Sequence, residues 1–158
     1  MKKLNTRIAG MMLAFAVIAF AFNSCTKDKL EDPEYNLDVS LAGGKGQGYI
    51  KFRQDPDAAK IINLDIKVNR LAPNREYLLQ RAVDSADNNC TSTAWLTLGK
   101  GLTPQSIKTD NAGNGEEALW RDVTALPTGA KYDIHFQVID AVSLEVVLTS
   151  GCYQYTIR

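Results

Sequence analysis

INLDIKVN, residues 62–69, alternates apolar and polar side chains without interruption. Ile62, Leu64, Ile66 and Val68 fall on one face of an extended chain, because successive side chains of a β-strand point to opposite sides. Period-two alternation with β-branched residues is typical of a strand with one face in a core and the other in solvent. This stretch predicts a half-buried strand.

YDIHFQV, residues 132–138, repeats the pattern. Weaker runs of the same kind lie at 36–41, 48–53, 76–83, 93–98, 116–123, 144–149 and 152–157. Turn-forming residues separate the runs, among them Gly43-Gly44, Asp55-Pro56 and Pro127-Thr128-Gly129. No window carries a convincing helical stripe. We therefore predict an all-β domain, an antiparallel Greek-key sandwich or flattened barrel.

Residues 1–24 have the organisation of an export signal. Lys2, Lys3 and Arg7 precede an uninterrupted apolar stretch, residues 8–22. A stretch of that length after a positive start is typical of a secretory signal and is short for a permanent membrane span. We expect the chain to leave the cytoplasm.

Cys25 follows directly on a small residue, Ser24. The segment from Phe22 to Cys25 resembles a bacterial lipobox, in the looser form found in Bacteroidota. That resemblance implies cleavage before Cys25 and lipidation of its thiol, which would make the membrane a partner. An ordinary signal peptide with a coincidental cysteine is the alternative. Its cleavage site, however, requires a small residue three positions before the cut, and Phe22 occupies that position. We expect a cell-envelope lipoprotein of the outer membrane.

Residues 25–35 are polar and rich in charge, which predicts a flexible linker between the lipid and a domain at 36–158. Lys27-Asp28 and Glu31-Asp32 also resemble the acidic tract that directs some Bacteroidota lipoproteins to the cell surface. A solvated tether explains the same residues, so both the periplasmic and the surface-facing placements stay open.

The charge of the chain bears on its partners, and its length bears on the number of domains. Residues 1–24 contain three of the 18 basic residues and no acid, so the rest of the chain has 15 basic against 18 acidic residues. A nucleic-acid partner would call for a basic face, and none is predicted. The length of the segment 36–158 suits one domain with a single core.

Cys90 and Cys152 remain once Cys25 is assigned to the lipid. In an oxidising compartment a pair of this kind predicts a disulfide. A reactive thiol or a metal-ligand role is the competing interpretation. It has little support, because neither cysteine lies in a C-x-x-C motif and the chain has one histidine.

Several motifs follow one another in a familiar order. QGYIKFRQ at 47–54 precedes Cys90-Thr91-Ser92, which is followed by TDNAG at 109–113, by the segment 129–135 and by Cys152. In this order they resemble the second strand, the first disulfide cysteine, the turn after the zinc loop, a strand that ends in a copper-ligating histidine, and the second disulfide cysteine of the copper/zinc superoxide dismutase family. The resemblance implies a Greek-key β-barrel.

A second family offers an alternative topology. The segments from Leu71 to Tyr77 and from Leu126 to Tyr132 each resemble the L-x-P…Y corner of immunoglobulin-like and fibronectin type III modules. Both topologies stay open at this point.

The metal ligands of the dismutase family are largely missing. Counting back from Cys90 places its two copper histidines at Leu79 and Arg81, and the bridging histidine falls near Leu96. A copper site needs several imidazoles, so we predict no metal, no cofactor and no catalytic residue.

His135 is the one candidate ligand that remains. It alternates with Asp133 and Gln137 on the polar face of its predicted strand, so we expect it to point into solvent as a surface residue.

Two tryptophans and one polar loop are the remaining candidates. An exposed Trp95 could stack on a glycan, whereas Trp120 follows Leu119 inside a strand and is predicted in the core. Asp84, Asp87 and Asn88 could offer oxygens to calcium, but without the rest of an oxygen cage they indicate a solvated loop.

We therefore expect a non-catalytic, lipid-anchored envelope protein whose sandwich binds a protein or glycan partner or has a structural role. A degenerate metalloenzyme of the dismutase type that uses His135, and a glycan-binding accessory lipoprotein that uses Trp95, are the alternatives.

Overall fold

A computed structural model describes residues 31–57 and 59–158. The fold is all-β, as predicted, and the described residues contain no helix. The strands are β1 (Leu37–Gly43), β2 (Gly46–Gln54), β3 (Ile61–Asn69), β4 (Glu76–Ser85), β5 (Leu96–Thr97), β6 (Gly99–Lys100), β7 (Thr103–Pro104), β8 (Ser106–Lys108), β9 (Gly115–Asp122), β10 (Lys131–Asp140), β11 (Val146–Ser150) and β12 (Tyr153–Thr156). The predicted export signal at 1–24 and the predicted lipidation site Cys25 lie outside these residues.

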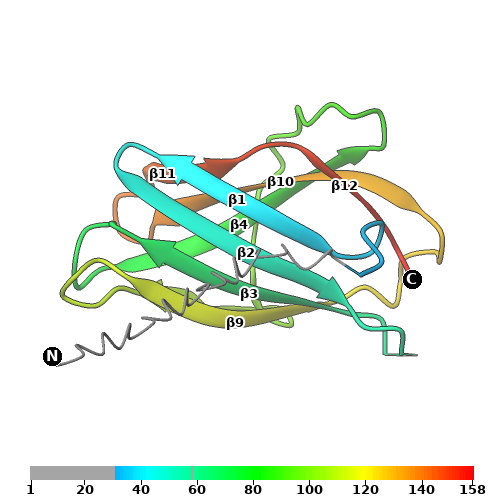
Figure 1. Cartoon of the computed structure of the whole chain (residues 1–158), viewed down its shortest axis with the longest axis horizontal. Coiled ribbons are helices and arrows are strands. Elements are labelled where there is room, and N and C mark those ends of the chain that lie inside the picture. Colours follow the sequence, from blue (N-terminus) through cyan, green and yellow to red (C-terminus); the bar gives the residue numbers. More distant parts are fainter. Residues whose placement is uncertain (1–30, 58) are drawn as a thin grey trace, which may run out of the picture.

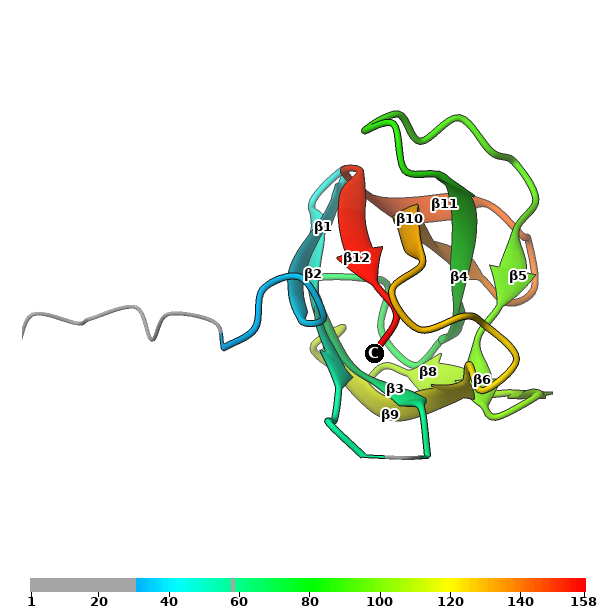
Figure 2. The ribbon, with the colours of Figure 1, turned by 90° about the vertical axis from the view of Figure 1, so that its right-hand side faces the viewer.

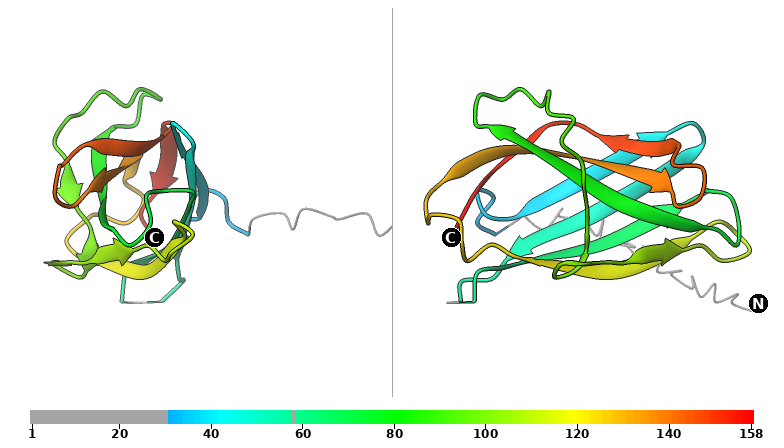
Figure 3. Two further views of the ribbon diagram at one scale, coloured as in Figure 1. Left: turned by 90° about the vertical axis from the view of Figure 1, so that its left-hand side faces the viewer. Right: turned by 180° about the vertical axis from the view of Figure 1, so that it is seen from behind.

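The strands form a nearly closed, flattened barrel (Figure 1). Hydrogen bonds connect them in the order β5-β4-β10-β11-β1-β2-β3-β9-β6-β7. One wall consists of β1, β2, β3 and β9, and the opposite wall of β4 and β10 (Figure 3, right). All pairings are antiparallel except the short contact of β6 with β9. In the part of the chain described, no helix is long and apolar enough to cross a membrane.

A Greek-key connection joins the two walls. β8 pairs with β4 and lies against β9, and β10 returns to pair with the other edge of β4. The spatial order is then β10-β4-β8-β9, with the fourth strand beside the first. β10 also pairs with β12 at one end and β11 at the other, so the last two strands act as one broken strand that Gly151 and Cys152 interrupt.

Alternation along the strands builds the core. In β3, Ile62, Leu64, Ile66 and Val68 are buried, as their spacing predicts. They meet inward side chains of the opposite wall such as Phe136. Burial of these apolar surfaces is the main driving force for the fold.

The hairpin of β1 and β2 is also as predicted. Gly43 pairs with Gly46, and Gly44 takes a φ of +52° that suits glycine. Gly44 and Lys45 form the tight turn that connects the two strands.

Two boundaries differ from the sequence prediction. The predicted strand at 93–98 is reduced to β5 at Leu96–Thr97, and the short strands β6, β7 and β8 were not predicted. Residues 31–35, assigned to the linker, form a turn in which Arg158 pairs with Asp32 and stacks over Tyr35. The folded part therefore begins before Asn36.

Candidate functional site

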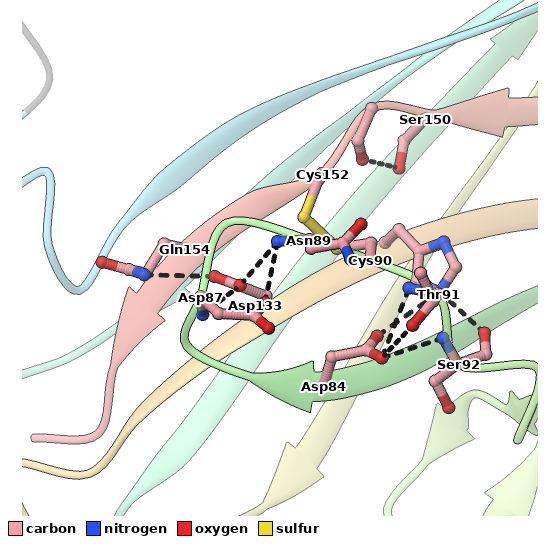
Figure 4. Close-up of a disulfide and its surroundings, with 12 residues drawn as sticks. Asp84, Asp87, Asn89, Cys90, Thr91, Ser92, Asp133, Ser150, Cys152 and Gln154 are labelled. Carbon is pink, nitrogen blue, oxygen red and sulfur yellow. Dashed lines mark hydrogen bonds and ion pairs between the residues drawn. A yellow bond between two sulfur atoms is a disulfide. The ribbon is translucent and has the colours of Figure 1, made fainter.

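A loop between β4 and β5 brings several of the predicted site residues together. It runs over the outer face of β4 and β10, and the disulfide between Cys90 and Cys152 attaches it to the start of β12 (Figure 4). The predicted pairing is confirmed, with Cα atoms 5.5 Å apart. We call residues 86–95 the disulfide loop.

Asp133 lies beneath the disulfide loop and is fully buried. Its carboxylate accepts hydrogen bonds from the backbone N–H of Asp87 at 2.8 Å and of Asn89 at 3.1 Å, and from Nε2 of Gln154 at 3.1 Å. Burial alone would raise the pKa of Asp133, but the hydrogen bonds from Gln154 and the loop amides outweigh it and hold the pKa below its ordinary value. The carboxylate therefore stays charged and holds the loop in place.

Asp84 plays a similar part at the other end of the disulfide loop. Its Oδ1 accepts hydrogen bonds from the backbone N–H of Ser92 at 2.8 Å and of Thr91 at 3.3 Å. Asp87, the next candidate calcium ligand, accepts from the N–H of Asn89 at 3.0 Å. The carboxylates that could have served calcium thus bind backbone amides of their own loop.

His135 is covered, which corrects the expectation that it points freely into solvent. Its side chain is 17% exposed. Nε2 lies 3.0 Å from the carbonyl oxygen of Ser92, and because a carbonyl only accepts, Nε2 donates a proton there. The ring of Trp95 lies 4.7 Å away between centroids. Alternation predicts a solvated polar face on β10, but the disulfide loop folds over this face.

The residues around His135 do not fit a copper or zinc site. Leu79, one of the two positions counted as copper ligands, is buried in the core, and Arg81 lies on the same inward face of β4. The residue that pairs with His135 across β4 is Ala82. No group of three or more histidine, cysteine or acidic side chains that could hold a metal ion occurs among the described residues.

The prediction for Trp120 is wrong, and the exposure of Trp95, which the sequence left open, can now be described. Trp120, predicted in the core, is 39% exposed, because it follows the buried Leu119 and successive residues of β9 face opposite sides. Trp95, the weak candidate for stacking on a glycan, is partly buried against His135. The exposed indole of this domain is therefore that of Trp120.

Sequence reasoning missed a second polar group of residues, inside the barrel. Arg81 on β4 and Arg121 on β9 occupy inward positions of their strands, beside Leu79 and Leu119. The signal was present in the alternation, since each arginine stands two residues after a buried leucine.

Comparisons of the chain with protein-family models, with curated proteins and with solved structures found no match.

Proposed function

We propose that this chain is a non-catalytic, lipid-anchored protein of the cell envelope whose β-barrel domain has a binding or structural role. The observation that carries the proposal is the disulfide between Cys90 and Cys152. Disulfides persist in oxidising compartments, which agrees with the export signal at 1–24 and with lipidation of Cys25.

The chemistry of the disulfide loop supports a non-catalytic role. General acids and bases need a free position for substrate within hydrogen-bond reach. Here His135 donates to Ser92, and Asp133 accepts three hydrogen bonds from the chain itself. These side chains hold the loop on the barrel, and the loop in turn covers them.

We also propose the relationship to the copper/zinc superoxide dismutase family. The segment that resembles the second strand of that family lies in β2, Cys90 lies in the loop after β4, and Cys152 lies at the start of the last strand. His135 lies in β10 next to the disulfide loop. The Greek-key barrel and these four placements support the resemblance, while the ligand set differs.

Lipidation can be tested in bacterial cells that express the full chain and are fed an alkyne-labelled fatty acid. We expect the label on the wild-type chain in the membrane fraction and none on Cys25→Ser. Label on both chains, or on neither, would contradict the anchor.

Catalysis can be tested on the same membrane fraction, supplied with copper and zinc and assayed for superoxide dismutation. We expect no activity above that of membranes with His135→Ala. Copper bound at one ion per chain, with activity that His135→Ala abolishes, would support the altered metalloenzyme instead.

Trp120 favours a second candidate function, the glycan-binding accessory. Its exposed indole borders a surface hollow that Gly101, Leu102 and Thr124 also line. An exposed indole can stack on the face of a sugar. Quenching of tryptophan fluorescence by a panel of glycans that is lost in Trp120→Ala and kept in Trp95→Ala would establish this function.

A further inference from the structure

The end of the barrel near the C terminus holds a pocket of about 200 Å³. Figure 2 looks onto this end, where the segment after β9 crosses between the walls. Phe52, Leu64, Ile134 and Phe136 line the pocket, so its inner wall is apolar. Arg81, Arg121 and Tyr155 also line it.

Arg81 has no partner for its charge in the described part of the chain. It follows Tyr77 and Leu79 on the inward face of β4, lines the pocket, and makes no hydrogen bond or ion pair through its guanidinium among the described residues. Burial lowers the pKa of Arg81, and the charge of Arg121 lowers it further against an opposing effect of Tyr155. Guanidinium groups stay charged in proteins, so a positive charge stands unpaired against an apolar wall.

Arg121 and Tyr155 add hydrogen-bond donors to the same pocket. Arg121 donates one hydrogen bond, to the carbonyl of Gly101 at 3.3 Å, and has no ion pair among the described residues. Burial raises the pKa of Tyr155 to about 12, so its hydroxyl keeps its proton. The only carboxylate that lines the pocket is Asp122, and its Oδ1 accepts from the N–H of Thr124 at 2.7 Å.

We propose that this pocket binds a small organic anion with a flat apolar body, of the type of an aromatic carboxylate. Two guanidinium groups and a phenol line the pocket, and each guanidinium presents its donors in the planar fork that suits a carboxylate. An apolar cavity of roughly 150 Å³ takes up benzene, so a pocket of about 200 Å³ has room for a benzene ring and a carboxylate. The carboxylate of the ligand would supply the partner that the charge of Arg81 lacks among the described residues.

This inference goes beyond the proposed function, since it needs neither the lipid on Cys25 nor the relationship to the dismutase family. A failure of the lipidation test would leave it untouched. A failure to bind the anion would likewise leave the anchor in place.

Fluorine NMR of 4-fluorobenzoate tests the proposal on the full chain kept in detergent micelles, whether or not Cys25 carries a lipid, with empty micelles as the blank. We expect saturable binding to the wild-type chain. Because hydrogen bonds to charged groups contribute roughly 1.5–3 kcal/mol, Arg81→Met and Arg121→Met should each weaken binding by at least about tenfold. 4-Fluorobenzyl alcohol, which has the same ring without the charge, should bind at least about tenfold more weakly.

Lys67→Met is the matched control, because Lys67 lies on the outer face of β3 in an exposed ion pair with Glu116. It should bind 4-fluorobenzoate like the wild-type chain. No saturation by 4-fluorobenzoate, equal binding of Arg81→Met, or equal binding of the alcohol would each overturn the proposal.

A thermal melt shows whether Arg81→Met is folded and separates a binding role from a structural one. Removal of an unpaired, half-buried charge should leave the melting temperature unchanged or raise it by about 2–4 °C. A melting temperature that falls instead would assign Arg81 to the structure and overturn the proposal.

Discussion

Asp133 beneath the disulfide loop and Arg81 inside the barrel end are charged side chains that the fold withdraws from water, one fully and one in part. Asp133 accepts three hydrogen bonds from the chain. Arg81 has no such partner among the described residues. A charge that the chain satisfies by itself stabilises the fold, whereas one left without a partner costs stability and is useful only if something else binds there. The two regions thus separate a structural cluster from a ligand site within one small barrel.

Among changes at the disulfide loop, removal of the disulfide should lower the free energy of unfolding most. The double variant Cys90→Ala/Cys152→Ala opens a cross-link that spans 62 residues. The chain-entropy relation gives a loss of about 4 kcal/mol in the free energy of unfolding. Urea denaturation measures it, with reduced wild-type chain as the control. A loss under about 1 kcal/mol would show that the hydrogen bonds of Asp133 and Asp84 hold the loop without the cross-link.

Asp133→Leu should have the next largest effect. It leaves the N–H groups of Asp87 and Asn89 without their acceptor in a buried place, which predicts a loss of about 3 kcal/mol. Urea denaturation should show Asp65→Leu, on the exposed face of β3, within about 0.5 kcal/mol of the wild type. Equal losses in the two variants would mean that the carboxylate of Asp133 does not anchor the loop.

Acid should reduce the contribution of Asp133 and its hydrogen bonds to the stability of the fold. The pKa of Asp133 in the folded chain lies below its ordinary value of 3.8, so its contribution to stability is complete above pH 3.8 and declines as the pH falls through the lower, folded-state pKa. Urea midpoints measured downward from pH 5 should therefore fall less steeply for Asp133→Leu than for the wild type. Parallel slopes would indicate that Asp133 is not the group that titrates.

Replacement of the two tryptophans should change the free energy of unfolding least. Trp95→Ala removes the ring that stacks on His135 and should cost about 1 kcal/mol. Trp120→Ala, on the outer face of β9, should cost less, roughly 0.5 kcal/mol. Hydrogen exchange of the amides in residues 86–95 should rise in Trp95→Ala alone. A rise in Trp120→Ala as well would contradict the assignment of Trp95 to the loop.

Alternation of side chains predicted the fold well, because it depends on local sequence. The long strands and the β1–β2 hairpin follow from spacing and turn chemistry, and the Cys90–Cys152 pair follows from the cysteine count once Cys25 is set aside. The pattern fails where a distant segment changes what a face contacts. His135 alternates like a surface residue, and only the loop from the neighbouring β4 covers it.

The pocket at the barrel end shows a second feature that alternation along the strands cannot predict. Alternation predicts that Arg81 and Arg121 lie on inward faces. It does not predict how close β4 and β9 come, because these strands belong to opposite walls and are 30 or more residues apart along the chain. Trp120 shows that the face of the strand decides exposure more than the residue type does. Its neighbour Leu119 is buried, so the side chain of Trp120 must point outward although it is large and apolar.

The most direct test of the contrast is one measurement on two variants, the free energy of unfolding of Asp133→Leu and of Arg81→Met, each of which replaces a charged side chain by an apolar one. We predict a loss of about 3 kcal/mol for Asp133→Leu and no loss, or a gain of about 1 kcal/mol, for Arg81→Met. Losses of similar size in both variants would contradict the division of this barrel into a structural cluster and a ligand site.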